Sequence, residues 1–460
     1  MKTVRILFTN DEELSNESQI KQIVSSSKQR FSVVHFKEEY VVVAKEIAKN
    51  KQSTEDVRKL AGSIAKDLRD RHVSEAVVTK ESLMNAWFNM NESDVITAFV
   101  EGWELGSYAF TTYISKKSND RVKLTVQADE SINDLVERGN KRATATNFSR
   151  DLMNELSNEL TPETFPTVLS ERFAKEENVT VTVHDKQSIE QLEMNGVLTV
   201  ARGSTYDPAF VEIRYEGDTK KPLVALVGKG VTFDTGGISL KRGRDLSDMR
   251  MDMGGAAAVA GAMDLLVSTK AQVNVVALIP IVENMPDRKS LIPGEVITYK
   301  NGSTVQVGNT DAEGRLILAD GIIRAEALKA SYIVDIATLT GAVVSALGTK
   351  VAGTFGSDEL AELMRKVGKD TGESNWQLPL VDSYDSYLKS DYADFSNISS
   401  KGEAGSITAA LFLRKFVTDQ SKWLHIDMAG VMETTDSGYD SKGGSGYGAR
   451  LLADFTEQLS

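Results

Sequence analysis

The alternation of apolar strands with helices from about residue 165 onward is the feature that most constrains the fold. Alternation of this kind favours a mostly parallel sheet covered by helices. In such a sheet, ligands bind where strands end in loops. We expect strands at 179–183, 210–215, 223–227, 273–278, 333–336 and 423–426, and helices at 188–195, 254–268 and 316–328.

A chain of 460 residues exceeds what one hydrophobic core usually supports, so two domains are expected. Residues 1 to about 127 mix short β-rich runs, such as 4–8, with amphipathic stretches. A long polar helix at about 128–158 connects the two parts. We therefore expect an α/β protein with a smaller N-terminal α/β domain over 1–158, which includes the connecting helix. A larger C-terminal α/β domain over 159–460 is expected to hold a central mixed, mostly parallel sheet.

The charge balance and the lack of cysteine exclude several classes of function. The chain has 66 Asp and Glu against 53 Lys and Arg, a formal net charge of −13, which argues against a nucleic-acid or anionic membrane surface. It has no cysteine, which excludes a disulfide scaffold, a thiolate zinc site and a cysteine nucleophile. The N-terminal segment has too few apolar residues for a signal peptide, and the apolar run 275–282 is too short to span a membrane. We expect a cytoplasmic protein with no membrane partner.

A glycine-rich loop follows the strand expected at 223–227. The segment VALVGKGVTFDTGGISLKRGRDLSDMRMDMGGAAAVAG, residues 224–261, carries Lys229, Asp234, Lys241 and Asp252. Glycines let the backbone turn sharply and approach a ligand closely. A plainer interpretation is that Asp252 only caps its helix and that the glycines serve packing. The loop lacks GxxxxGK[ST], so it does not predict a phosphate cradle.

A second reactive segment, YKNGSTVQVGNTDAEGRLILADGI, covers residues 299–322. Asn301-Gly302 predicts a hairpin turn, and 304–307 alternates as a strand. If the chain stays extended beyond that strand, Asp311, Glu313 and Arg315 share one face. The alternative is that the arginine only pairs with a carboxylate on a solvated surface.

Together the two segments supply four carboxylates and two lysines in strand-terminal contexts, without a nearby histidine or cysteine. The four histidines of the chain are scattered and form no HExxH, so we expect them to be structural. Carboxylate-rich sites suit hard or borderline divalent ions. A pair of ions about 3.5–4 Å apart needs bridging carboxylates, and four clustered acids need a compensating cation.

With these residues, the sequence resembles the leucyl aminopeptidases of the cytosolic two-metal family. The resemblance rests on GKGVTFDTGGISLK, MRMDMGGAA, NTDAEGRL and DIATLTGA, with weaker support from EAGSITAALFL and WLHIDMAG. It implies a metal-dependent aminopeptidase that releases N-terminal amino acids, leucine-like and other apolar ones preferred, from peptides in intracellular turnover. It also makes 159–460 the catalytic peptidase domain. One departure is MNELSNELTPE, where many relatives carry a proline-rich turn, and it bears on interdomain geometry.

The resemblance implies a role for each matching metal ligand. Asp234 and Glu313 would bridge two divalent ions, Zn²⁺ or Mn²⁺, with Mg²⁺ and Co²⁺ also compatible. Lys229 and Asp252 would complete the more labile site, and Asp311 the tighter one. A lysine amine ligates only when neutral, so the metal would have to lower the pKa of Lys229.

The resemblance also implies the remaining chemistry. Lys241 would stay charged and steady the scissile carbonyl and its oxyanion. Arg315 would hold a bicarbonate ion that acts as general base toward a metal-bridging water. The expected pocket for the substrate amine and first side chain consists of Met249, Asn309, Ala312, Thr338, Leu339, Gly341, Ala429 and Met432.

The expected partners are peptides with a free N-terminus and other copies of the chain in a homohexamer. Two other classes remain open from the residues. A two-metal phosphoesterase would turn over a phosphate ester and ignore a free α-amine. A DNA-binding regulator is disfavoured by the charge of −13, and a salt-dependent gel shift on duplex DNA would revive it.

Overall fold

The computed structural model describes residues 3–45, 52–115, 121–243 and 245–460. The chain forms two compact units. The N-terminal unit comprises Met1–Asn147 with Thr434–Lys442, and the C-terminal unit comprises Phe148–Glu433 with Gly443–Ser460. The expected domains, 1–158 and 159–460, are each one continuous range. In the structure the N-terminal unit is discontinuous, because it also includes Thr434–Lys442. Each unit is built from helices and sheets, in agreement with the expected α/β class.

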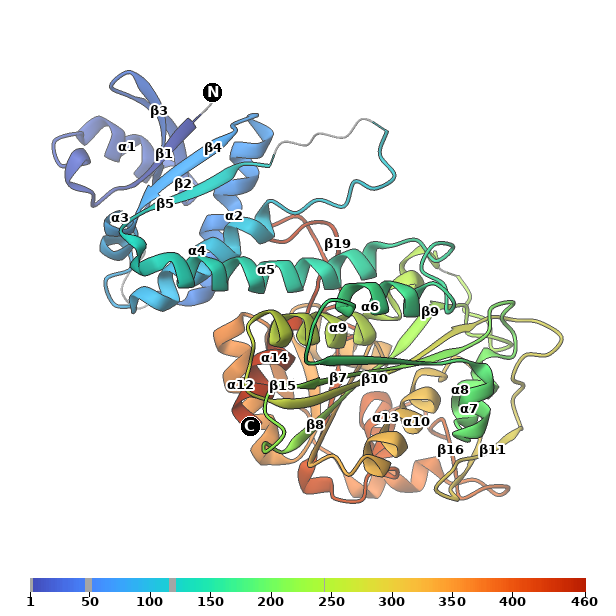
Figure 1. The fold of residues 1–460 in the computed structure, drawn as a ribbon. Helices are drawn as coiled ribbons and strands as arrows, with labels where there is room; N and C mark the ends of the chain where they lie inside the picture. Colours follow the sequence, from blue (N-terminus) through green and yellow to red (C-terminus); the bar gives the residue numbers. More distant parts are fainter. Residues whose placement is uncertain (1–2, 46–51, 116–120, 244) are drawn as a thin grey trace. The chain divides into compact units, whose positions relative to one another are not determined.

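The N-terminal unit contains a five-stranded sheet of order β2-β3-β1-β4-β5, parallel except for the β2–β3 pair (Figure 1). Alternate side chains of β1 enter different hydrophobic clusters, as the two-residue period of a strand requires. Helices α2 and α4 pack together against one of these clusters. The elements are β1 (Thr3–Phe8), η1 (Glu12–Leu14), α1 (Ser18–Ser26), β2 (Phe31–Phe36), β3 (Glu39–Ala44), α2 (Thr54–Asp70), β4 (Glu75–Thr79), α3 (Lys80–Ala86), α4 (Glu92–Gly106), β5 (Lys123–Gln127) and η3 (Glu130–Ile132).

The C-terminal unit is organised around a mixed sheet of order β15-β14-β17-β13-β8-β10-β7-β6, with β9 paired to β10. The central strands β17, β13, β8 and β10 run parallel, and β14, β7 and β6 form antiparallel pairs. The strands are β6 (Val179–His184), β7 (Ala209–Glu216), β8 (Leu223–Gly228), β9 (Gly230–Asp234), β10 (Asn274–Asn284), β13 (Tyr332–Ala337), β14 (Ala352–Gly356), β15 (Asn375–Gln377) and β17 (Trp423–Asp427). The expected mixed, mostly parallel sheet is confirmed.

Helices cover both faces of this sheet. Figure 1 shows α9, α12 and α14 on one side and α8, α10 and α13 on the other, in agreement with their contacts. The helices are α6 (Phe165–Phe173), α7 (Lys186–Gln191), α8 (Asn195–Ala201), η4 (Ser247–Met251), α9 (Gly254–Ser268), α10 (Gly314–Ala327), α11 (Gly341–Leu347), α12 (Asp358–Thr371), η5 (Asp382–Leu388), α13 (Gly405–Arg414), η6 (Gln420–Lys422) and α14 (Ala449–Leu459). Helix α5 (Asn133–Asn154) runs through the division at residue 147.

A small sheet lies beside the main one and bears on the site. It joins β11 (Val296–Thr298), β12 (Thr304–Gln306) and β16 (Phe395–Ser396), with β11 and β12 antiparallel. The hairpin expected at Asn301-Gly302 is confirmed, and Gly302 has φ 90°, a value that favours glycine. A further pair, β18 (Glu433–Thr434) and β19 (Gly443–Gly444), completes the strands of the described residues.

The expected strands and two of the three expected C-terminal helices match observed elements within a few residues. The helix expected at 188–195 is wrong in part, because α7 ends at Gln191 and α8 starts at Asn195. Glu193 adopts φ 57°, a left-handed conformation that a helix does not continue through. The connecting helix, expected at 128–158, is shorter and spans Asn133–Asn154.

Among the described residues, one helical stretch, Ser247–Ser268, is long and apolar enough to cross a membrane by length and composition. Its most apolar window is 94% buried inside the protein. Helix α9 supplies most of this stretch and packs on β8, β13 and α14. The apolar composition is therefore that of a core helix.

Candidate metal centre

The parallel strands of the C-terminal unit bring several polar residues to one edge of the sheet. Lys229 lies between β8 and β9, and Asp234 ends β9. Strand β13 pairs with both β8 and β17, with Ile336 opposite Gly228 and Ala337 opposite Asp427. The residue after β13, Thr338, therefore lies at the same edge. This is the place where an α/β sheet of this kind binds ligands.

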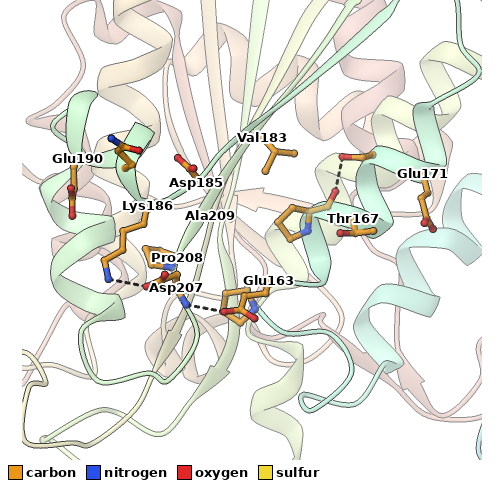
Figure 2. Close-up of a pocket in the computed structure, with 14 residues that line it drawn as sticks. Glu163, Thr167, Glu171, Val183, Asp185, Lys186, Glu190, Asp207, Pro208 and Ala209 are labelled. Carbon is orange, nitrogen blue, oxygen red and sulfur yellow. Dashed lines mark hydrogen bonds and ion pairs between the residues drawn. The ribbon is translucent and has the colours of Figure 1, made fainter.

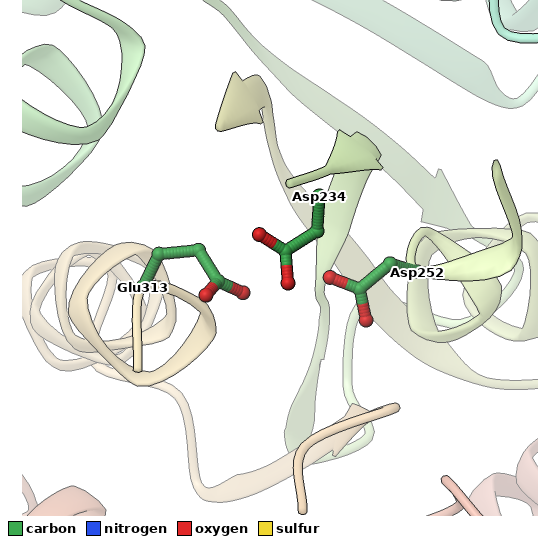
Figure 3. Close-up of side chains that lie close together, drawn as sticks. All are labelled: Asp234, Asp252 and Glu313. Carbon is green, nitrogen blue, oxygen red and sulfur yellow. The ribbon is translucent and has the colours of Figure 1, made fainter. Parts of the chain in front are cut away.

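Three carboxylates meet at this edge. One oxygen from each of Asp234, Asp252 and Glu313 lies within 4.8 Å of the others. Figure 3 shows the three side chains pointing toward one another from β9, from the turn before α9 and from the start of α10. All three residues are at least 95% buried. Asp311, which is less buried, joins the cluster through Lys241, which forms ion pairs with both Asp311 and Asp234.

Two lysines partly neutralise these acids. Lys229 Nζ lies 2.7 Å from Asp252 and 3.0 Å from Glu313, and donates to the carbonyl of Thr338 at 3.0 Å. Lys241 Nζ lies 2.7 Å from Asp234 Oδ2. Burial by itself lowers the pKa of each lysine, but the surrounding carboxylates raise it by more, so both have raised pKa values. Without metal, both lysines are therefore the cations of the cluster.

The acids remain incompletely compensated. Burial, with repulsion from Asp234, raises the pKa of Glu313 to about 8, although Lys229 lowers it. Burial likewise raises the pKa of Asp252 to about 6. Glu313 Oε2 is buried and has no hydrogen-bond partner, a costly state for a carboxylate oxygen. A buried acidic donor set with an unused ligand atom fits divalent cations.

The extended geometry expected for Asp311, Glu313 and Arg315 is wrong. Strand β12 ends at Gln306, and α10 begins at Gly314 with Glu313 at its N-cap position. Glu313 and Arg315 are therefore placed by the first turn of a helix rather than by strand alternation. The chain turns before the helix because Asn309 Oδ1 accepts a hydrogen bond from the Asp311 amide at 2.8 Å.

Arg315 is 5% exposed, which excludes the alternative of a solvated surface ion pair. Its Nη1 donates to the carbonyl of Asn397 at 2.8 Å, and its Nε has no hydrogen-bond partner. Burial lowers the pKa of Arg315 to about 10, although Glu313 and Asp427 act in the opposite direction. A buried guanidinium with an unused donor is suited to hold a small anion.

The residues expected to line the substrate pocket lie on four segments of the C-terminal unit. The hydroxyl of Thr338 donates to Asp252 Oδ1 at 2.8 Å. Asp427 accepts from the amides of Leu339 and Ala429, at 3.1 and 3.3 Å, and so connects the segments after β13 and β17. The other expected pocket residues lie in η4 (Met249), before α10 (Asn309 and Ala312), at the first position of α11 (Gly341) and after β17 (Met432).

Three buried residues that hold this arrangement were not identified from the sequence. Asn284 Nδ2 donates to Asp234 Oδ1 at 2.8 Å and to the carbonyl of Thr310 at 3.0 Å. The others are Asn397 and Asp427. Asn284 and Asp427 end strands β10 and β17, so a polar residue at the end of an apolar strand is a signal that could have found them.

A cavity of about 660 Å³ lies elsewhere in the C-terminal unit, between α6, β6 and the turn before β7 (Figure 2). Apolar groups such as Pro166, Val183 and Pro208 line much of it. Lys186 pairs with Asp207 at its rim, at 2.8 Å. None of the residues predicted to bind metal or substrate lines this cavity.

Comparisons with known proteins identify the family of this chain. The catalytic domain of the cytosol aminopeptidase family matches residues 147–453, and the N-terminal domain of the same family matches residues 47–117. A probable cytosol aminopeptidase of Persephonella marina is 38% identical over 426 residues, covering 91% of this chain and 85% of the relative. One of Chlorobaculum tepidum is 40% identical over 430 residues, covering 89% and 84%.

Solved structures show the same architecture. The bottromycin maturation enzyme BotP in complex with Mn superposes with a TM-score of 0.89 and 29% sequence identity, covering 99% of each chain. The family matches cover most of the chain, including every residue of the carboxylate cluster. The chain therefore belongs to the cytosol aminopeptidase family and is a metal-dependent aminopeptidase, a hydrolase that acts on peptides.

Proposed function

We propose that the carboxylate cluster holds two divalent ions. Asp234 and Glu313 would bridge them, Lys229 and Asp252 would complete the more labile site, and Asp311 the tighter one. When bound, the ions would acidify the attacking water and polarise the scissile carbonyl. The observation that carries the proposal is the meeting of three buried carboxylates within 4.8 Å, one of them with an unused oxygen.

Lys241 and Arg315 would supply the rest of the reaction. Lys241 is held at the cluster by Asp234 and Asp311, and its ammonium would stabilise the oxyanion that develops in the transition state. Arg315 is buried with an unused donor, and it would hold the bicarbonate that accepts the proton of the water. The positive charges of Lys241 and Arg315 are held in position by these contacts before the substrate binds.

The substrate is a peptide with a free N-terminus, whose α-amine would lie at the labile site. The first side chain would enter a pocket shaped by the segments after β13 and β17, together with Met249 and the loop before α10. Apolar walls of this kind favour leucine-like side chains, and discrimination of one methylene is worth only about 1–3 kcal/mol. A broad apolar preference follows.

The ions would be Zn²⁺ or Mn²⁺, with Mg²⁺ and Co²⁺ also compatible with oxygen-rich ligands. The related enzyme BotP has been solved in complex with Mn, which supports Mn²⁺ as one candidate. We further propose a homohexamer that works in intracellular peptide turnover in the cytoplasm. The relatives named cytosol aminopeptidase support this location.

The test is hydrolysis of a panel of aminoacyl amides by the metal-stripped protein, titrated separately with each of the four ions. Leucyl amide should be hydrolysed, and N-acetyl-leucyl amide, which lacks the free amine, should not. Equal turnover of both, or turnover of a phosphate diester instead, would overturn the proposal.

Glu313→Ala should abolish activity and lower the number of bound ions. A matched control is Asp320→Ala, which removes another buried carboxylate from the same helix. Asp320 accepts from the Val197 amide at 2.8 Å and has no part in the cluster. Loss of metal in both variants would show that any damage to α10 empties the site, and would contradict the assignment of Glu313.

A further inference from the structure

Asn397 lies beside the loop that carries two of the proposed metal ligands. It follows β16, which runs parallel to β12 with Phe395 opposite Val305. The side chain is fully buried. Because β12 leads directly into residues 308–313, the segment around Asn397 lies alongside that loop.

The amide of Asn397 uses its full hydrogen-bonding capacity on this loop. Its Oδ1 accepts from the amides of Gly308 and Asn309, at 2.8 and 3.3 Å. Its Nδ2 donates to the carbonyls of Asn309 and Ala312, at 2.7 and 3.2 Å. A primary amide offers two donors and two acceptor positions, and all four are used. These partners also fix the orientation of the side-chain amide. If the amide were flipped, its NH₂ group would face two backbone N–H groups and its oxygen would face two carbonyls.

The main chain of Asn397 reaches the proposed anion site. Its carbonyl accepts from Arg315 Nη1 at 2.8 Å, and its amide donates to the carbonyl of Gln306 at 2.9 Å. The two chain segments are in close contact, since a Cβ at Gly308 would lie 2.6 Å from Ile398 Cγ2. One residue is thus bonded to the loop before the metal ligands and to the arginine that follows them.

We propose that Asn397 is a positioning residue that fixes the loop bearing Asp311 and Glu313 in register with Arg315. This inference rests on the roles proposed above for those three residues. Residues that orient metal ligands from outside typically contribute about 10–100-fold to metal affinity or activity. Truncation of the amide would remove four hydrogen bonds from this partly buried loop, and the loop would move to replace them.

A purely structural role would give a different result, and Asn375 is the matched control. Asn375 is also buried, and its Nδ2 donates to the carbonyls of Met364 and Glu373, at 3.0 and 3.4 Å. It belongs to β15 and contacts α12, and neither element supplies a predicted site residue. Asn375→Ala should therefore lower stability without changing metal binding.

The experiment measures Mn²⁺ binding to the full-length metal-stripped protein by titration calorimetry, without substrate. Asn397→Ala should weaken Mn²⁺ binding about 10–100-fold, while Asn375→Ala, with a comparable fall in melting temperature, should bind Mn²⁺ like the wild type. Equal Mn²⁺ affinity in Asn397→Ala and the wild type, or equal losses in both variants, would overturn the inference.

Asn397→Asp provides an independent check that keeps the shape of the side chain. It retains the acceptor and replaces the Nδ2 donor with an oxygen facing two carbonyls. The added negative charge would by itself tighten Mn²⁺ binding, so weaker binding isolates the loss of positioning, and tighter or unchanged binding contradicts it. Because no substrate is present, the result stands apart from the aminopeptidase test. A wild type that binds Mn²⁺ but cleaves no peptide would refute the proposed function alone.

Discussion

Gly314 opens α10 directly against the side chain of Lys229. A Cβ at this position would lie 2.5 Å from Lys229 Cε and 2.8 Å from its Nζ. Carbon atoms in contact normally lie about 3.5–4.0 Å apart, so Gly314→Ala must displace the lysine by about 1 Å. The lysine cannot yield freely, because its Nζ is bonded to Asp252, Glu313 and the carbonyl of Thr338.

The expected cost has two parts. Overpacking of a filled site costs about 1–3 kcal/mol, offset by about 0.4–1 kcal/mol from the reduced freedom of the unfolded chain. The free energy of unfolding should therefore fall by about 0–2.6 kcal/mol. Activity should fall as well, because a displacement of about 1 Å at a reacting centre can cost about 100-fold.

The assay combines kcat/KM for leucyl amide, bound metal per chain and the melting temperature. Gly402→Ala is the control, since a Cβ there meets nothing within 4 Å. We expect a loss of kcat/KM and of the more labile metal in Gly314→Ala, with wild-type values for Gly402→Ala. Wild-type metal binding and kcat/KM in Gly314→Ala would refute the reasoning, because they would mean that the position of Lys229 is not critical.

Three further outcomes are expected. Lys241→Ala should lower kcat about 100–1,000-fold while the metal stays bound; loss of metal would instead identify a ligand. Arg315→Ala should make activity insensitive to added bicarbonate, and a retained response would rule out its role. Burial raises the pKa of Glu212, but the hydrogen bonds from His184 and Arg324 lower this pKa by a larger amount. The pKa of Glu212 in the folded protein therefore lies below the ordinary value. The resulting stability is present above the ordinary glutamate pKa of about 4.3 and is lost as the pH falls through the folded pKa. Glu212→Gln should therefore destabilise the protein by about 1–3 kcal/mol at pH 7, with a difference that disappears in acid; a difference independent of pH in urea unfolding would contradict this.

Much of the C-terminal unit could be predicted because its strands are long apolar runs. Strand β10 is buried along its whole length, and α9 coincides with the helix expected at 254–268. The short strands β14 and β15 were not predicted, since AGTFG and NWQ carry little periodic signal. The break between α7 and α8 was missed because a left-handed Glu193 has no sequence signature.

For the site, local motifs predicted the candidate residues but not their geometry. The sequence analysis put Asp311, Glu313 and Arg315 on one face on the condition that the chain stays extended, whereas a helix N-terminus positions the last two. Tertiary contacts decided this, because the loop takes its shape from Asn397, which is distant in sequence. No local pattern predicts such a contact.

The sequence by itself predicted the residues of the proposed metal centre, the family of the chain and the strands that end at the site, because these depend on residue identity and short-range periodicity. Only the tertiary structure decided which acids meet, that Lys229 is confined between Asp252, Glu313 and Gly314, and that Arg315 is buried with a free donor. These features arise where segments far apart in the chain converge at one edge of a parallel sheet. Burial and proximity at that edge, rather than residue type alone, set the charges and the unused ligand atom.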